Sequence, residues 1–548
     1  MTGNGAQTDA SESDDRARID TIVAGGGIAG LTIAHDLAAR GYRVLVLEAE
    51  ERIGGTVARL ELPGIDLSLD AGAESFAVRG GAVAELAHEL GLGDAIVEPN
   101  PAGAWLQLTD RAVPMPTRTL LGIPSTPLAR DVIAALGWGG ALRAHLDRLM
   151  PVLRIGTDDA LGPLVRRRMG QKVLDRLVAP LAGGVYSADP ELLDVDVVAP
   201  GLNGGITRAG SLSGGVAFVL EERAQAAAGA GAGADAKPGS AVQGIRGGVH
   251  QLAERLAARA REQHADIRTG VRVLAATETD TGWRVETDAG THEASSLVVA
   301  LPEHEARRLL LPSPASSVEG ASRDHDVTVE LVTLVFPAGA IEGDPRGTGV
   351  LVAGDNAAVR AKAMTHSTAK WAWLREAAAG REIVRLSYGS GAAAPATEGL
   401  DDDAAAALAL ADAQAIFGMA LPQPIASARV RWQRGQPSSI IGARSRQQQL
   451  RDAAAARRSL FVVGGAVAGT GLAQVVPQAR RTALEIRREQ FAVPGSPWTH
   501  DILPDAADQL AAHETSEATP RDGETDTTSG IGSPGASAPG DTAERGEA

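Results

Sequence analysis

The spacing of apolar side chains changes twice between residues 19 and 47, and each change marks a predicted element. A short apolar run closed by Ile22 and Val23 is typical of a buried parallel strand. Helical spacing follows over about residues 29–40, and a second apolar strand is predicted at residues 42–47. A strand, a helix and a parallel strand in this order predict a βαβ unit.

The rest of the chain predicts both strands and amphipathic helices. Residues 105–116 are predicted to form a hairpin, and residues 117–199 a mainly helical lobe with proline breaks. Within this lobe, the run Arg166–Arg168 is predicted to be a solvated helix face. Further helices are expected at 83–90, 247–261, 401–417 and from 472 to about 490, and strands at 267–285, 292–300, 327–336, 383–388 and 459–463. The pattern indicates an α/β (α+β) fold.

Three segments lack the apolar content of a packed core. Residues 1–18 are polar and acidic, and residues 505–548 are acidic and rich in Ser, Thr, Gly and Pro, so both are expected to be disordered. Residues 224–239 are of low complexity and are expected to form a flexible loop.

The turn of the βαβ unit carries glycines at the spacing of a dinucleotide site. Gly25, Gly27 and Gly30 would allow the tight turn, the approach of the pyrophosphate and the packing of the helix on the strand. The helix that follows directs its free N–H groups and its positive end at the phosphates. Glu48 follows the end of the second strand, 18 residues after Gly30, where it can bind both ribose hydroxyls and disfavours the 2′-phosphate of NADP.

The composition of the chain excludes several classes of site and function. The 548 residues include no cysteine, which excludes disulfides, thiolate metal sites and cysteine nucleophiles. The net charge of −16 argues against nucleic-acid binding, and the 11 scattered histidines show no metal-ligand spacing. No signal peptide and no apolar run long enough to span a membrane is visible, so we expect a cytoplasmic protein.

The segment after Glu48 resembles the E-x-x-x-R-x-G-G motif of flavoproteins with two dinucleotide-binding segments. Here the motif runs from Glu48 through Arg52 to Gly54 and Gly55, and a second glycine-rich turn, Gly464–Leu472, follows the last predicted strand. This layout is similar to the superfamily of amine oxidases, phytoene desaturases and protoporphyrinogen oxidases. The resemblance implies FAD, a mixed-sheet substrate domain and an inserted helical lobe.

Longer segments select one branch of this superfamily. The stretches 105–124, 166–190, 209–212, 365–373 and 431–432 resemble, in order, segments of bacterial HemY-type porphyrinogen oxidases, and the likeness spans residues 19–490. It implies an FAD-binding domain of residues 19–104, 240–305 and 455–492, and a substrate-binding domain of residues 105–223 and 306–454. Gly465 stands where amine oxidases usually carry an acid, and the chain has only three tyrosines for an aromatic cage. Both points disfavour amine oxidation.

The resemblance also implies individual contacts. The implied FAD contacts are Gly25, Gly26, Gly27, Ile28, Ala29, Gly30, Glu48, Ala49, Arg52, Gly55, Gly72, Ala73, Glu74, Ser75, Val273 through its backbone, Trp432, Thr470, Gly471 and Leu472. For Trp432 a purely structural core role stays open. Arg79 and Arg59 are the candidates for binding a substrate carboxylate, and the choice between them stays open because the family's P-Q-Y-like motif is absent at residues 436–439.

The activity implied is the FAD-dependent oxidation of coproporphyrinogen III to coproporphyrin III in haem biosynthesis, with O2 as acceptor and H2O2 as product. The flavin N5 would do the chemistry, and no catalytic side chain is expected. Protoporphyrinogen IX oxidation is the close alternative. An amine oxidase or carotenoid desaturase-like reaction, or a non-catalytic binding protein on the same scaffold, is a further alternative. Peripheral membrane contact and contact with other haem-pathway enzymes also stay open.

Overall fold

A seven-stranded sheet carries the predicted βαβ unit. The computed structural model describes residues 19–150, 160–229, 241–311, 327–391, 394–434 and 439–491. Strand β1 (Ile19–Ala24) pairs in parallel with β2 (Val44–Leu47) and with β15 (Gly290–Val299). The order along the sheet is β12 (Asp266–Arg268), β2, β1, β15, β14 (Gly282–Thr287) and β13 (Val273–Thr279), and β21 (Leu460–Val462) pairs in parallel with β15. Strands from distant parts of the chain therefore meet beside the first glycine turn.

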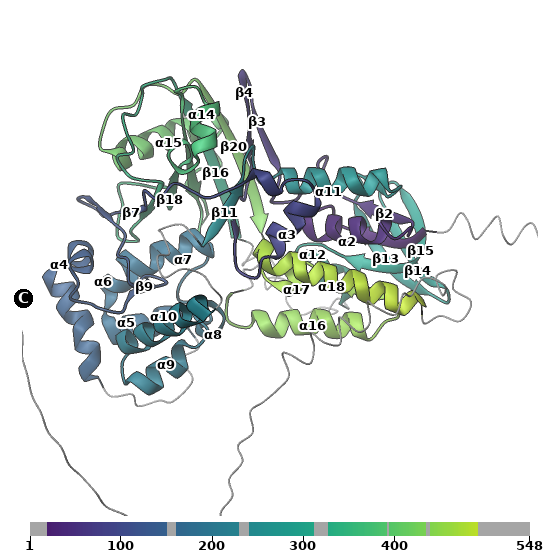
Figure 1. Cartoon of the computed structure of the whole chain (residues 1–548), viewed down its shortest axis with the longest axis horizontal. Coiled ribbons are helices and arrows are strands. Elements are labelled where there is room, and N and C mark those ends of the chain that lie inside the picture. Colours follow the sequence, from purple (N-terminus) through teal and green to yellow (C-terminus); the bar gives the residue numbers. More distant parts are fainter. Residues whose placement is uncertain are drawn as a thin grey trace, which may run out of the picture. The chain divides into compact units, whose positions relative to one another are not determined.

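Two helices cover this sheet and pack against each other. They are α2 (Ile28–Ala38), which follows the glycine turn, and α11 (Gln251–Glu262) (Figure 1). Leu31 of α2 and Leu252 of α11 are fully buried in one apolar cluster, which Val476 of α18 (Leu472–Phe491) joins. The described residues up to Glu489 form one compact unit, and of a second unit, residues 490–548, only the end of α18 is described.

A second sheet combines antiparallel pairs with one parallel pair, as expected for the substrate domain. Its order is β20 (Ala426–Arg434), β16 (Val327–Phe336), β19 (Glu382–Tyr388), β18 (Ala363–His366), β17 (Gly349–Val352), β7 (Ala104–Gln107) and β8 (Ala112–Pro114). Strands β7 and β8 are the predicted hairpin, whereas β7 and β17 run parallel. Helix α15 (Asp402–Phe417) buries Ala409 and Phe417 against Leu334 and Phe336 of β16.

Shorter elements connect these layers. Strand β3 (Arg59–Leu62) pairs with β4 (Ile65–Asp70), and β11 (Val242–Ile245) pairs with β5 (Phe76–Ala77) and β6 (Ile96–Val97). The remaining helices outside the helical lobe are α3 (Ala82–Glu89), η1 (Gly93–Ala95), α12 (Glu303–Leu310), α13 (Ser367–Lys370), α14 (Ala372–Ala377), α16 (Ala443–Ala455) and α17 (Gly465–Ala468).

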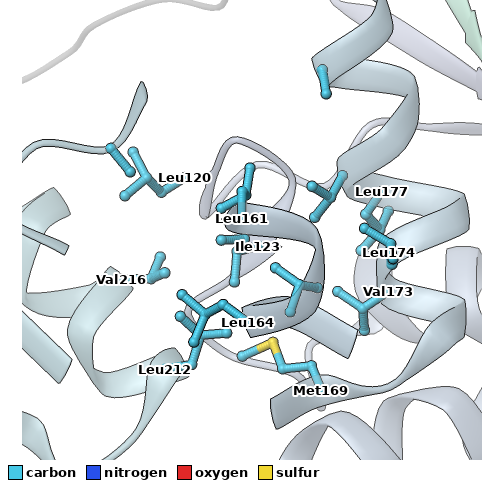
Figure 2. Packing of buried hydrophobic residues seen from close by; sticks show 14 of the residues in the cluster. Leu120, Ile123, Leu161, Leu164, Met169, Val173, Leu174, Leu177, Leu212 and Val216 are labelled. Atoms are coloured by element: carbon cyan, nitrogen blue, oxygen red, sulfur yellow. The ribbon is translucent and has the colours of Figure 1, made fainter. Parts of the chain in front are cut away.

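The predicted helical lobe is inserted between β8 and β11. Its elements are β9 (Thr119–Leu120), β10 (Ile123–Pro124), α4 (Arg130–His145), η2 (Leu146–Leu149), α5 (Leu161–Met169), α6 (Gln171–Val173), η3 (Leu174–Val178), α7 (Ala179–Val185), α8 (Val195–Val198), α9 (Leu202–Ala209) and α10 (Leu212–Gly229). The lobe has its own apolar core, in which Leu164 of α5 lies beside Leu212 of α10 (Figure 2). Among the described helices, none combines the length and the apolar character needed to cross a membrane.

The arginine run of this lobe is only partly solvated, so the predicted solvated face is wrong for Arg168. Its side chain is 6% exposed, and its Nε donates to Asp147 Oδ1 at 2.6 Å. Asp147 is fully buried and also accepts a hydrogen bond from the Ser213 N–H at 2.8 Å. A buried carboxylate requires such a partner, since an unpaired charge in the core is strongly destabilising.

Two predicted boundaries also differ from the structure. Helix α10 continues to Gly229, six residues into the range 224–239 expected as a loop, because its alanines favour a helix. Helices α12 and α16, placed mostly with the substrate domain at residues 306–454, bury Leu310 and Leu450 in the core of the first sheet. The disorder expected at residues 1–18 and 505–548, and the rest of the expected loop, lie outside the described residues.

Candidate cofactor and substrate site

The glycines of the first turn have three different steric environments. Gly25 has φ +110°, and a Cβ there would lie 2.5 Å from the Ala300 carbonyl oxygen. A Cβ at Gly30 would lie 2.0 Å from the Gly25 carbonyl oxygen, so α2 packs as closely on the turn as glycine permits. A Cβ at Gly27 would meet no protein atom within 4 Å. The turn is therefore tight at Gly25, packed at Gly30 and open at Gly27, as pyrophosphate binding requires.

Glu48 is held beside this turn. Its Oε2 accepts a hydrogen bond from the Gly26 N–H at 2.7 Å, and its Oε1 accepts one from the Glu50 N–H at 2.9 Å. Next to it, the Val271 N–H donates to the Glu48 carbonyl at 2.8 Å, which places the segment leading to Val273 alongside. This is the arrangement expected for the adenosine end of a dinucleotide. The backbone contact of Val273 with FAD stays a prediction.

The second glycine pair closes on the first turn. The Gly54 N–H donates to the Gly26 carbonyl at 2.8 Å, and Gly27 and Gly54 form an isolated parallel bridge. Arg52 donates to the Gly55 carbonyl at 3.0 Å. The first glycine turn and the segment from Glu48 to Gly55, which contains Ala49, are thus adjacent in space. Both are predicted to contact the pyrophosphate region of FAD.

The segment Gly72–Ser75 continues this surface. The Ala73 N–H donates to the Thr56 carbonyl at 3.1 Å, and Trp432 donates its Nε1–H to the Ala71 carbonyl at 3.1 Å. The Arg52 guanidinium lies over the Trp432 ring, 4.8 Å from its centroid. Trp432 is 7% exposed and packs in the core with Ala71. It therefore belongs both to the core and to the candidate site.

The C-terminal glycine turn lies against the start of α2. A Cβ at Gly464 would lie 3.0 Å from Ala29 Cβ, and Leu472 packs against the cluster that contains Ile28. Gln478 fixes the turn, because its Oε1 accepts from the Gly464 N–H at 3.0 Å and its Nε2 donates to the Val462 carbonyl at 3.2 Å. Thr470 and Gly471 are exposed at this junction.

Glu74 has partners that the sequence did not reveal. Its carboxylate is bound by Lys370 and Arg385, from α13 and β19. Burial raises the pKa of the Glu74 carboxyl, but the charges of Arg385 and Lys370 outweigh it and lower the pKa to about 2. The Glu74 side chain is therefore part of an ion-pair cluster, and its predicted contact with FAD stays a prediction.

The two candidate substrate arginines differ in their surroundings. Arg59 is bound by Glu254 of α11, with Nε–Oε1 and Nη2–Oε2 distances of 2.8 and 2.7 Å. Arg79 is exposed and has no hydrogen bond or ion pair among the described residues. Burial raises the pKa of Tyr186 at the end of α7, while the charges of Arg223 and Arg79 oppose this, so Arg79 lies on the side of the helical lobe. Arg59 is thus already paired and Arg79 is exposed, and which of them binds a substrate carboxylate stays a prediction.

Most of the candidate site, from Ile28 onward, falls within one family match. Residues 28–486 match the family described as flavin containing amine oxidoreductase. The chain belongs to this family. It is an FAD-dependent oxidoreductase, and the open space at Gly27 beside Glu48 fits the cofactor.

Comparisons with individual proteins are consistent with this membership. Coproporphyrinogen III oxidase of Bacillus subtilis (strain 168) is 26% identical over 469 residues, covering 84% of this chain and 96% of the relative. Coproporphyrinogen III oxidase of Mycobacterium leprae is 29% identical over 472 residues, covering 85% and 98%. A solved structure from Exiguobacterium sp. 255-15, described as a candidate protoporphyrinogen oxidase, has a TM-score of 0.72 at 25% identity and covers 86% of this chain and 99% of that chain.

Proposed function

We propose that the protein oxidises coproporphyrinogen III to coproporphyrin III. The supporting observation is its similarity to enzymes with that name over about 85% of the chain and nearly their whole length. FAD bound at this site would supply a two-electron acceptor for hydride, and removal of six electrons from the macrocycle would take three such steps. With O2 as the final acceptor, three O2 are reduced to three H2O2 for each porphyrin formed.

The chain's own residues supply binding and position. Glu48 and the turn around Gly27 hold the adenosine and pyrophosphate parts, and Trp432 fixes the Gly72–Ser75 segment. Arg79 pairs with a substrate carboxylate on the side of Tyr186. We expect no catalytic side chain, because the aromaticity of the porphyrin product drives the complete six-electron oxidation.

The test is the stoichiometry of the reaction in air. Coproporphyrinogen III is mixed with the FAD-loaded protein, and porphyrin fluorescence, O2 uptake and H2O2 are measured together against a protein-free control. The proposal predicts three O2 consumed and three H2O2 formed per porphyrin. Porphyrin formation no faster than in the protein-free control would contradict it.

Protoporphyrinogen IX is the alternative substrate. Protoporphyrinogen oxidase 1 of Arabidopsis thaliana is 27% identical over 350 residues, but it covers only 61% of this chain and 63% of its own length. The coproporphyrinogen oxidases match over a longer part of the chain. The extent of the match therefore favours the substrate with four propionates.

A cytoplasmic enzyme with peripheral membrane contact is part of the proposal, and contact with other haem-pathway enzymes stays a prediction. Trp138, Leu142, Leu146 and Leu149 form an exposed apolar stripe at helical spacing along α4 and η2, with Trp138 73% and Leu149 79% exposed. The exposed Arg148 beside the stripe suits an anionic lipid surface.

The stripe makes a measurable prediction. Replacing both Trp138 and Leu142 with serine should weaken binding to anionic vesicles at least about tenfold, because each buried large apolar side chain contributes about 1.5–3 kcal/mol. Ile425→Ser, at another exposed apolar position, is the matched control. Co-sedimentation with vesicles measures the effect, and a wild-type protein that stays in the supernatant would contradict the proposed contact.

A further inference from the structure

Three charged side chains from distant segments meet at Glu74, within the Gly72–Ser75 segment. Lys370 Nζ lies 2.6 Å from Glu74 Oε1, and Arg385 Nη2 lies 3.1 Å from Glu74 Oε2. Glu74 follows β4, Lys370 ends α13, and Arg385 lies on β19 of the second sheet. We call these three residues the charge triad.

The charge triad is largely removed from solvent. The side chains of Glu74, Lys370 and Arg385 are 11%, 18% and 13% exposed. The low pKa of Glu74 keeps it ionised at neutral pH. Arginine stays protonated in proteins, and Lys370 is paired with a carboxylate, so one negative and two positive charges leave a net charge of +1.

Arg385 also holds the backbone of the cofactor segment directly. Its Nη1 donates to the Asp70 carbonyl at 3.1 Å and to the Gly72 carbonyl at 3.0 Å. On its other side the segment is held by the Ala73 N–H, which donates to the Thr56 carbonyl at 3.1 Å, and a Cβ at Gly72 would lie 2.2 Å from the same oxygen. The segment predicted to line the flavin is therefore clamped between the first turn region and the charge triad.

A net charge next to a redox group changes its potential. Reduction of flavin adds negative charge, and a nearby positive charge in a poorly solvated site stabilises the reduced form more than the oxidised form. Such a charge shifts the reduction equilibrium without touching the reacting atoms.

We propose that Lys370 and Arg385, held by Glu74, are positioning residues that fix the Gly72–Ser75 segment and, through their net positive charge, raise the reduction potential of the bound FAD. This inference depends on FAD binding at that segment and not on the identity of the substrate. It can therefore hold or fail independently of the porphyrinogen proposal.

The neighbouring charges do not alter the comparison between variants. The Asp70 carboxylate is directed at α11, where it accepts hydrogen bonds from the Val249 and His250 N–H groups at 3.0 and 2.8 Å and contacts His250 Nδ1 at 2.9 Å. These groups stay in place when Lys370 or Glu74 is substituted. Their contribution cancels when potentials are compared.

The experiment measures the flavin potential of FAD-loaded variants by equilibration with a redox dye. Lys370→Met reduces the net charge of the triad to zero and should shift the equilibrium toward oxidised flavin about tenfold, which is about 30 mV for a two-electron couple. The double variant Glu74→Gln/Lys370→Met breaks the ion pair completely but restores a net charge of +1, so its potential should return toward wild type. Lys370→Arg keeps the charge and should change little.

The double variant separates electrostatics from support of the fold. If the triad has a purely structural role, the double variant should differ from wild type at least as much as Lys370→Met does, both in flavin reduction potential and in thermal stability. A double variant whose potential stays as low as that of Lys370→Met overturns the proposal, as does a shift of less than about twofold in Lys370→Met. Should Lys370→Met fail to fold, Lys370→Gln makes the same charge change with a polar side chain, and the same two outcomes decide.

Discussion

Replacing Gly27 with alanine is expected to leave the apoprotein folded and to weaken FAD binding at least about 100-fold, equivalent to about 2.7 kcal/mol. The new Cβ meets no protein atom within 4 Å, and φ of −74° at this residue suits any L-amino acid. The methyl group would enter the space that the pyrophosphate needs next to the turn. FAD content after purification and titration of the apoprotein with FAD measure the effect.

Gly30→Ala is the matched control, because it should lower the stability of the apoprotein, whereas Gly27→Ala should weaken FAD binding and leave the apoprotein folded. Its Cβ would lie 2.0 Å from the Gly25 carbonyl oxygen, so the turn or α2 must move. We expect a loss of about 1–3 kcal/mol in the free energy of unfolding of the apoprotein, as for other overpacked sites. Thermal unfolding without FAD distinguishes the two variants. A Gly27→Ala protein that retains its FAD would contradict the assignment of this turn.

The second large effect is expected at Arg79. If it pairs with a substrate carboxylate, Arg79→Ala should lower kcat/KM about 10- to 100-fold, mainly through KM, because a hydrogen bond to a charged group contributes about 1.5–3 kcal/mol. Steady-state kinetics with coproporphyrinogen III measure this, and Arg79→Lys should recover part of the loss.

Arg59 provides the contrast within the same protein. Its guanidinium is already bound by the Glu254 carboxylate, in an ion pair with both side chains more than a third exposed. Arg59→Ala should therefore leave KM within about twofold of wild type and cost at most about 1 kcal/mol of stability. A larger KM effect at Arg59 than at Arg79 would reverse the assignment.

The parts of the fold that follow from local pattern could be predicted. The first turn carries its information in the glycines themselves, since backbone geometry requires Gly25 and Gly30, and the approach of the pyrophosphate requires Gly27. The hairpin of β7 and β8 and helix α15 likewise follow from the spacing of apolar residues and from the turn residues between elements.

The remaining features depend on partners far apart in the sequence. The local sequence does not distinguish Arg168 from its exposed neighbour Arg167. Arg168 lies in the core because it pairs with the buried Asp147 of another segment. Lys370 and Arg385 are separated from Glu74 by about 300 residues, so no spacing rule could bring them together. The same holds for α16, whose Leu450 packs on the first sheet although the preceding strand, β20, belongs to the second.

The central claim is tested most directly by mixing the FAD-loaded protein anaerobically with coproporphyrinogen III and, separately, with protoporphyrinogen IX, while the visible absorption band of the flavin is recorded. We expect rapid bleaching with coproporphyrinogen III, slower bleaching with protoporphyrinogen IX, and porphyrin fluorescence after air is admitted. A flavin band that neither porphyrinogen bleaches would contradict the proposed function.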